Sequence, residues 1–216
     1  MTDVKFCGVT RPDDAAYAAV LGAAYVGVIF AGGPRTLRPA DASKVMAAVP
    51  RGGPKRVGVF CGTPPSEVAR SAEEIPLDVI QLHVQPGAGG ADEVAAVAMR
   101  AGRPIWAVLR CKGRRVPEDA STLALHADAL LIDAYVAGKV GGTGVPLPWE
   151  ALAEAVAAVR GTKPLVLAGG LTPDNVARAI AVLRPDVVDV SSGVERSPGV
   201  KDHARMRAFM DAVNET

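Results

Sequence analysis

The chain has no excess of either charge and no apolar stretch long enough to cross a membrane. Lys and Arg total 24 and Asp and Glu total 23 among 216 residues. Without a basic surplus we expect no nucleic-acid partner, and a small or anionic metabolite suits the balance better. No apolar run reaches the roughly 18 to 20 residues that a membrane-spanning helix needs, and no secretory pattern precedes the first apolar run. The sequence therefore predicts a cytoplasmic protein without a membrane partner.

Cysteine is scarce. The three cysteines, Cys7, Cys61 and Cys111, form an odd set without metal-ligand spacing. Such a set is typical of free thiols in a reducing compartment rather than of disulfides or a zinc site. We therefore expect no metal in this protein, and we interpret Cys61 and Cys111 as structural residues.

Short apolar, β-branched runs recur about eight times along the chain. Most are continuous rather than alternating, which is typical of parallel strands buried on both faces. The expected strands are residues 3–8, 24–30, 55–60, 78–82, 104–109, 128–133, 164–168 and 187–190.

Helical stretches separate these runs, and several begin with a proline at a position that needs no hydrogen-bond donor. We expect helices over residues 12–21, 39–49, 65–72, 91–101, 148–160, 172–183 and 201–213, with a weak one near 117–125. An open doubly wound sheet would show the same alternation, but no Gly-x-Gly-x-x-Gly follows the first strand. The repeat count predicts a single (β/α)8 TIM barrel over residues 1–216, with a glycine-rich loop at residues 136–148.

In such a barrel the chemistry lies at the carboxyl ends of the strands, where this chain places a thiol and a carboxyl group. Cys7 follows the first strand, and Asp133 ends the sixth. A thiolate favoured by a cation such as Arg35 could act as a base, and a partly desolvated carboxyl could act as an acid. The alternatives are that Cys7 is a small core filler and Asp133 a loop carboxylate.

Two glycine-rich turns after the last two strands are candidates for holding a phosphate. Gly169 and Gly170 allow close backbone approach, and Ser191, Ser192 and Gly193 offer amide donors and hydroxyls. Barrels often bind phosphate with the loops after strands 7 and 8. Ordinary turns are the alternative.

Arg35 and His83 complete the polar strand ends. The Arg35 guanidinium suits an aromatic carboxylate, although it could be a solvated loop charge. A histidine in such a position is more often a structural residue than a catalyst, and this is the alternative for His83.

These segments together resemble the phosphoribosylanthranilate isomerase family, over essentially the whole chain. Lys5-Phe6-Cys7-Gly8-Val9-Thr10 is similar to the family's opening motif, and Gln81-Leu82-His83 and Gly141-Gly142-Thr143-Gly144 are similar to two further motifs. Residues 168–176 and 189–195 resemble the last two. Five motifs in order at strand ends make the resemblance specific.

The resemblance implies an Amadori rearrangement of N-(5-phosphoribosyl)anthranilate, without metal or organic cofactor. By matching position it makes Cys7 the general base and Asp133 the general acid, with Arg35 on the anthranilate portion. The glycine loops would hold phosphate, and His83, Gly142 and Gly144 would contact substrate. A monomer or a homodimer is expected.

Other readings of the same segments stay open. A histidine-pathway aminoimidazole ribonucleotide isomerase would perform the same rearrangement, but that family typically has aspartate where this chain has Cys7. A barrel that binds phosphate without catalysis is the alternative of another class. The chain departs from the family pattern at Val84-Gln85-Pro86 and Val145-Pro146-Leu147, which bears on turnover and substrate range.

Overall fold

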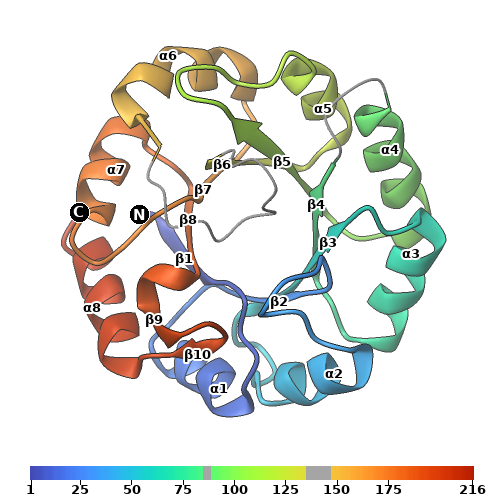
Figure 1. Cartoon of the computed structure of the whole chain (residues 1–216), viewed down its shortest axis with the longest axis vertical. Coiled ribbons are helices and arrows are strands. Elements are labelled where there is room, and N and C mark those ends of the chain that lie inside the picture. The colour runs from blue at the N-terminus through green and yellow to red at the C-terminus, as the bar shows by residue number, and fades with distance from the viewer. Residues whose placement is uncertain (85–88, 135–146) are drawn as a thin grey trace.

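A computed structural model of the chain describes residues 1–84, 89–134 and 147–216, and within them it shows a closed eight-stranded parallel barrel (Figure 1). Each strand pairs with the next along the chain, and β1 pairs with β8 to close the ring. The barrel strands are β1 (Asp3–Phe6), β2 (Tyr25–Ile29), β3 (Lys55–Cys61), β4 (Val79–His83), β5 (Ile105–Cys111), β6 (Ala129–Ala134), β7 (Leu165–Leu167) and β8 (Val187–Val190). The predicted TIM-barrel fold is confirmed.

A ring of helices surrounds the barrel (Figure 1). The helices are α1 (Pro12–Val20), α2 (Pro39–Ala47), α3 (Pro65–Glu74), α4 (Gly90–Ala101), α5 (Ala120–His126), α6 (Trp149–Arg160), α7 (Val176–Leu183) and α8 (His203–Asn214). The first three begin at a proline, where the fixed φ suits the helix and the missing N–H costs nothing. The weakly predicted fifth helix is present as the short helix α5.

Strand side chains alternate between two separate cores because successive residues point to opposite faces. In β1, Val4 and Phe6 join the large outer core between strands and helices, whereas Lys5 points into the barrel. The inner core is mainly aliphatic, with Trp106 as its largest member. Cys111, expected two residues beyond the fifth strand, is instead the last residue of β5.

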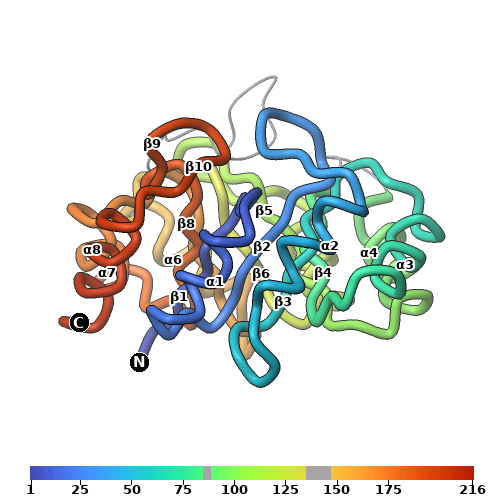
Figure 2. The backbone as a smooth tube through the Cα atoms, turned by 90° about the horizontal axis from the view of Figure 1, so that it is seen from below, coloured from blue at the N-terminus to red at the C-terminus, as the bar shows by residue number. Residues whose placement is uncertain are grey.

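A small antiparallel hairpin interrupts the last connection, which the sequence pattern does not predict. After β8 come a single turn of 3-10 helix (Ser192–Val194) and then β9 (Glu195–Ser197) and β10 (Val200–Lys201). Figure 2 shows this hairpin and the β2–α2 loop rising from the same end of the barrel, away from the chain termini. That end carries the carboxyl ends of the strands.

Candidate active site

The carboxyl ends of the strands enclose a cavity of about 450 Å³. This volume lies in the range of about 300–1,000 Å³ usual for small-molecule sites. The predicted site residues that line it are Cys7, Arg35, His83, Asp133, Gly169, Gly170, Ser191, Ser192 and Gly193. Gly142 and Gly144 lie outside the described residues.

Asp133 lies near the end of β6 and is only 5% exposed. Burial raises the pKa of this carboxyl from 3.8 to about 6, although the Ala134 amide donates a 2.8 Å hydrogen bond to its Oδ1 atom. A carboxyl with such a pKa is protonated often enough near neutrality to deliver a proton. The burial and the raised pKa of Asp133 therefore suit a general acid.

Gly169, expected at the phosphate, also makes room for this carboxyl. It has φ of +90°, and a Cβ there would lie 3.0 Å from Asp133 Oδ1 and from the Ala134 nitrogen. A larger residue would be strained and would press on the acid. The glycine after β7 thus serves the position of Asp133, which its motif alone did not indicate.

Cys7 lies just beyond β1, where its amide donates to the Val190 carbonyl at 2.9 Å. Burial raises the pKa of its thiol, and the positive charge of Lys5 is the largest influence in the opposite direction. Arg35 is the cation expected from the sequence. The structure instead places Lys5 beside the thiol, with Lys201 as a weaker contributor.

Arg35 reaches the cavity from the β2–α2 loop, held by a bidentate ion pair. Its Nε and Nη2 atoms donate to Glu195 at 2.8 and 2.6 Å. Lys201 Nζ donates to the same carboxylate at 2.9 Å and to the Cys7 carbonyl at 2.6 Å. The β9–β10 hairpin therefore fixes Arg35 and the backbone of Cys7 together, with Glu195 bound to the Nε and Nη2 atoms of Arg35.

The β7–α7 turn is held by Asn175. Its side chain accepts a hydrogen bond from the Thr172 amide and donates to the Gly170 carbonyl, both at 2.9 Å. Gly193 of the neighbouring β8 loop packs directly on the Leu171 carbonyl. The two predicted phosphate loops are thus preformed and in contact with each other.

His83 is neutral in this site, since burial lowers the pKa of its imidazole to about 3. Its Nε2 atom lies 3.2 Å from Gln81 Nε2, and Gln81 Oε1 accepts from Lys5 at 2.8 Å. Because the Gln81 amide donates, His83 Nε2 accepts and the proton resides on Nδ1. His83 can therefore contact a ligand as an uncharged group only.

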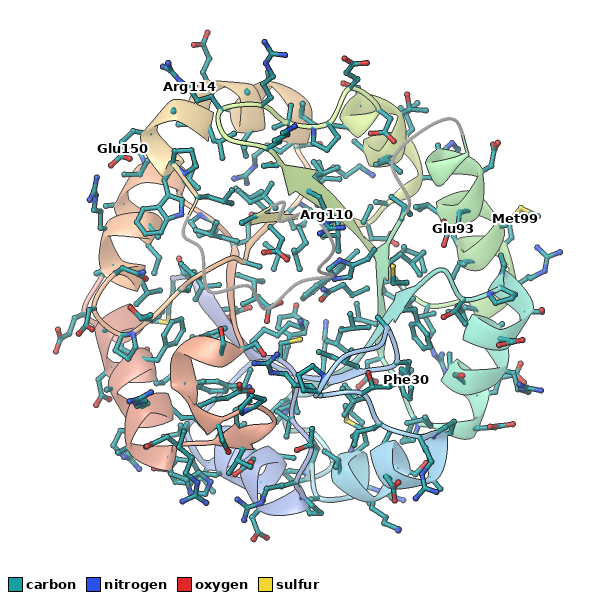
Figure 3. All side chains as sticks on the ribbon, viewed as in Figure 1. Phe30, Glu93, Met99, Arg110, Arg114 and Glu150 are labelled. Atoms are coloured by element: carbon teal, nitrogen blue, oxygen red, sulfur yellow. The ribbon has the colours of Figure 1, made fainter. Side chains whose placement is uncertain are left out.

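Lys5, Gln81 and Asp189 form a buried polar layer that is not among the site residues predicted from the sequence. Each lies two residues before a strand-end residue already singled out, so the period of two places it directly below that residue. Arg110 also points from β5 towards the barrel interior (Figure 3). A polar residue two positions before a strand end is the signal that would have found this layer.

Among the described residues, no group of three or more His, Cys, Asp or Glu side chains is placed to hold a metal ion. In the same part of the chain, no helix has the length and apolar character needed to span a bilayer.

The fold and the cavity together define an enzyme of the (β/α)8-barrel class, with its site at the carboxyl ends of the strands. Residues 4–212 match the family model described as N-(5'phosphoribosyl)anthranilate (PRA) isomerase. The chain belongs to this family, which confirms the resemblance seen in the sequence.

Individual relatives agree with this membership. N-(5'-phosphoribosyl)anthranilate isomerase of Pseudomonas fluorescens (strain Pf0-1) is 41% identical over 212 residues, which cover 97% of each chain. The crystal structure of phosphoribosyl anthranilate isomerase from Thermus thermophilus is similar with a TM-score of 0.85 at 35% identity, covering 99% of each chain. A phosphoribosyl anthranilate isomerase solved with reduced 1-(o-carboxyphenylamino)-1-deoxyribulose 5-phosphate gives 0.83 at 30% identity, covering 100% of each.

Proposed function

We propose that this chain isomerises N-(5'-phosphoribosyl)anthranilate to 1-(2-carboxyphenylamino)-1-deoxyribulose 5-phosphate, with Cys7 as general base and Asp133 as general acid. The reaction is a step of tryptophan biosynthesis, the activity of the family to which the chain belongs. The observation that carries the residue assignment is that one cavity brings together a buried carboxyl of raised pKa and a thiol beside a buried ammonium.

The reaction begins with ring opening. Asp133 donates its proton to the furanose ring oxygen while the bond from that oxygen to C1 breaks. The anthranilate nitrogen supplies its lone pair to C1, which gives an iminium. The raised pKa of Asp133, about 6, keeps a proton available for this step near neutral pH.

Proton removal follows at C2. The iminium makes the C2 proton acidic, and the Cys7 thiolate removes it while the C2–H electrons form a C1=C2 bond and neutralise the nitrogen. The resulting enolamine transfers its C2 hydroxyl proton to C1 overall and becomes the ketone. Cys7 then carries the C2 proton and Asp133 is ionised, and proton exchange with solvent returns both groups to their starting states. No oxidant or reductant enters.

The other residues that line the cavity bind the substrate. The loops containing Gly169, Gly170 and residues 191–193 hold the phosphate, and the Nη1 side of Arg35 takes the anthranilate carboxylate. Three buried atoms on cavity residues, His83 Nδ1, Asp189 Oδ1 and Ser191 Oγ, have no hydrogen-bond partner within the described residues. Such atoms are consistent with a polar substrate. Substrate contacts by Gly142 and Gly144, cytoplasmic location, and a monomeric or homodimeric state remain predictions.

The test follows the loss of anthranilate-type fluorescence under single-turnover conditions, with substrate made in situ. Wild type should convert substrate rapidly, and Cys7→Ala and Asp133→Asn should each lose at least about two orders of magnitude in rate. Cys61→Ala is the matched control, because this half-buried thiol ends β3 and is not among the cavity-lining residues. A folded wild type without conversion would refute the activity, whereas full activity of Cys7→Ala would refute only the base.

A further inference from the structure

Lys5 is a fully buried lysine in the interior of the barrel, below the cavity. Its side chain is 0% exposed. Its Nζ atom donates to Asp189 Oδ2 at 2.7 Å and to Gln81 Oε1 at 2.8 Å, and it lies 6.0 Å from the centre of the Trp106 ring. Two of its three N–H groups are thus used by neighbours on β8 and β4, and the ammonium has a fixed position.

Folding alone does not account for this ammonium. Desolvating two charges costs about as much as their attraction returns, so a buried ion pair is often no more stabilising than apolar residues of similar volume. The surrounding inner core is mainly aliphatic, with residues such as Val108 and Leu131. A charged pair in this setting is therefore better explained by what it does to the cavity above it.

The ammonium lies next to the Cys7 thiol. Gly27 of β2 leaves the space that both occupy: a Cβ there would be 3.2 Å from Cys7 Sγ, 3.2 Å from Lys5 Cε and 3.4 Å from Lys5 Nζ. The sulfur and the ammonium thus border the same small space beside Gly27. At this separation the positive charge of Lys5 acts directly on the thiol.

We propose that the Lys5 ammonium is the charge against which the Cys7 thiolate forms, so that Lys5 is a positioning residue of the isomerisation. This inference rests on the proposed function of Cys7 as the general base. Asp189 fixes the ammonium and offsets part of its field. Lys5 lies beside the base rather than among the residues that line the cavity, so it acts through Cys7.

The charges facing Cys7 agree with this role. Lys5 on β1 and Lys201 on β10 lower the pKa of the thiol, whereas Asp189 on β8 raises it, and burial raises it most. Arg35, from the β2–α2 loop, is neutralised by its ion pair with Glu195. Lys5 also lowers the pKa of Asp133, and Asp189 raises it. Each member of the ion pair therefore shifts the pKa values of the acid and the base in the same direction, and the two members act in opposite directions.

The opposite signs give a test that does not depend on turnover. Iodoacetamide alkylation of Cys7 would be followed by peptide mass spectrometry across a range of pH, which separates Cys7 from Cys61 and Cys111. Since one pKa unit changes the thiolate fraction about tenfold, Lys5→Met should slow alkylation near neutral pH by about tenfold or more. Asp189→Asn should accelerate it by several-fold, because Lys5 then faces Cys7 without a neighbouring carboxylate.

Controls keep the test interpretable. Lys55→Met makes the same chemical change at the exposed start of β3 and should leave alkylation unchanged. If Lys5→Met fails to fold, because Asp189 is left as a buried unpaired charge, the double variant Lys5→Met/Asp189→Asn replaces it. Alkylation in the double variant should still be slower than in wild type, since Lys5 outweighs Asp189 at the thiol.

Single-turnover isomerisation supplies the second readout. Both limbs of its pH profile should move to higher pH in Lys5→Met and to lower pH in Asp189→Asn, which a merely structural role would not produce. Unchanged alkylation in a folded Lys5 variant, or shifts of the same sign in both variants, would overturn the inference while leaving wild-type isomerisation intact. If alkylation changes in the variants as expected but the wild type does not isomerise the substrate, the proposed function is overturned. The role of Lys5 in that reaction is then overturned with it.

Discussion

Arg35 and Glu195 face each other at the rim of the barrel as a bidentate ion pair, with Nη2 2.6 Å from Oε2 and Nε 2.8 Å from Oε1. The two residues are 160 positions apart in the chain. Glu195 is also bound by Lys201, whose ammonium holds the Cys7 carbonyl. One carboxylate thus links the arginine proposed to bind anthranilate to the backbone of the proposed base.

Glu195→Gln should weaken substrate binding more than the chemical step. Without the carboxylate, the Arg35 guanidinium loses its fixed orientation, and binding must then supply the ordering that the ion pair supplies now. We expect KM to rise about tenfold with a smaller change in kcat, measured by steady-state fluorescence kinetics. Glu150→Gln is the matched control, since it breaks a 2.6 Å ion pair with Arg178 on the exposed helix surface. A lower KM would mean that Glu195 competes with the substrate carboxylate for Arg35.

The barrel itself follows from local sequence patterns. Each strand is an apolar run buried on both faces, and each of the first three helices starts at a proline, so both elements have local signals. A count of eight strand–helix units then predicts that the sheet closes into a barrel. Asp133 and Cys7 could be placed at the cavity for the same reason, because each lies at the carboxyl end of a strand.

The interactions that tune the site could not be predicted in this way. The hairpin from Glu195 to Lys201 is short and polar and has no periodic pattern, so its contact with Arg35 depends on the folded chain. The pairing of Lys5 with Asp189 joins strands that meet only when the barrel closes. Long-range ion pairs of this kind are set by topology, and the sequence around each partner does not identify the other.

Asp133→Asn should stabilise the fold at neutral pH while abolishing catalysis. The folded-state pKa, about 6, is above the ordinary 3.8, so the folded state binds this proton more tightly than the unfolded state does. Well below pH 3.8 the carboxyl is protonated in both states and does not change the free energy of unfolding. As the pH rises from there through about 6, the carboxyl increasingly lowers the free energy of unfolding. At pH values above that range, a pKa shift of this size lowers the free energy of unfolding by about 3 kcal/mol.

Asparagine keeps the Oδ1 acceptor for the Ala134 amide and carries no charge, so it removes this cost. Urea unfolding should show the variant to be more stable than wild type at pH 8 and nearly equal to it at pH 4. Asp186→Asn is the contrasting control, because Asp186 is ion-paired with Arg160 near the surface and should not gain stability. An equal stability difference at both pH values would contradict the raised pKa of Asp133.

Gly193→Ala should separate the two loops proposed to hold phosphate. A Cβ at Gly193 would overlap the Leu171 carbonyl oxygen and lie 3.3 Å from Thr172 Cα, and these backbone atoms cannot rotate away as a side chain would. The β8 loop must therefore move off the β7–α7 turn, which carries Gly170 and is held by Asn175. If both loops contribute donors to one anion as proposed, the affinity for inorganic phosphate should fall about tenfold or more.

Isothermal titration with inorganic phosphate measures this loss, and competitive inhibition of the isomerisation provides a second value. Gly62→Ala is the matched control: Gly62 has φ of +63° but open space around its Cβ position, so alanine there costs about 1–2 kcal/mol of backbone strain without a clash. The control should be less stable yet bind phosphate as wild type does. If Gly193→Ala loses stability to the same extent but keeps its phosphate affinity, the contact between the loops supports folding only, and the anion must be bound without the 191–193 loop.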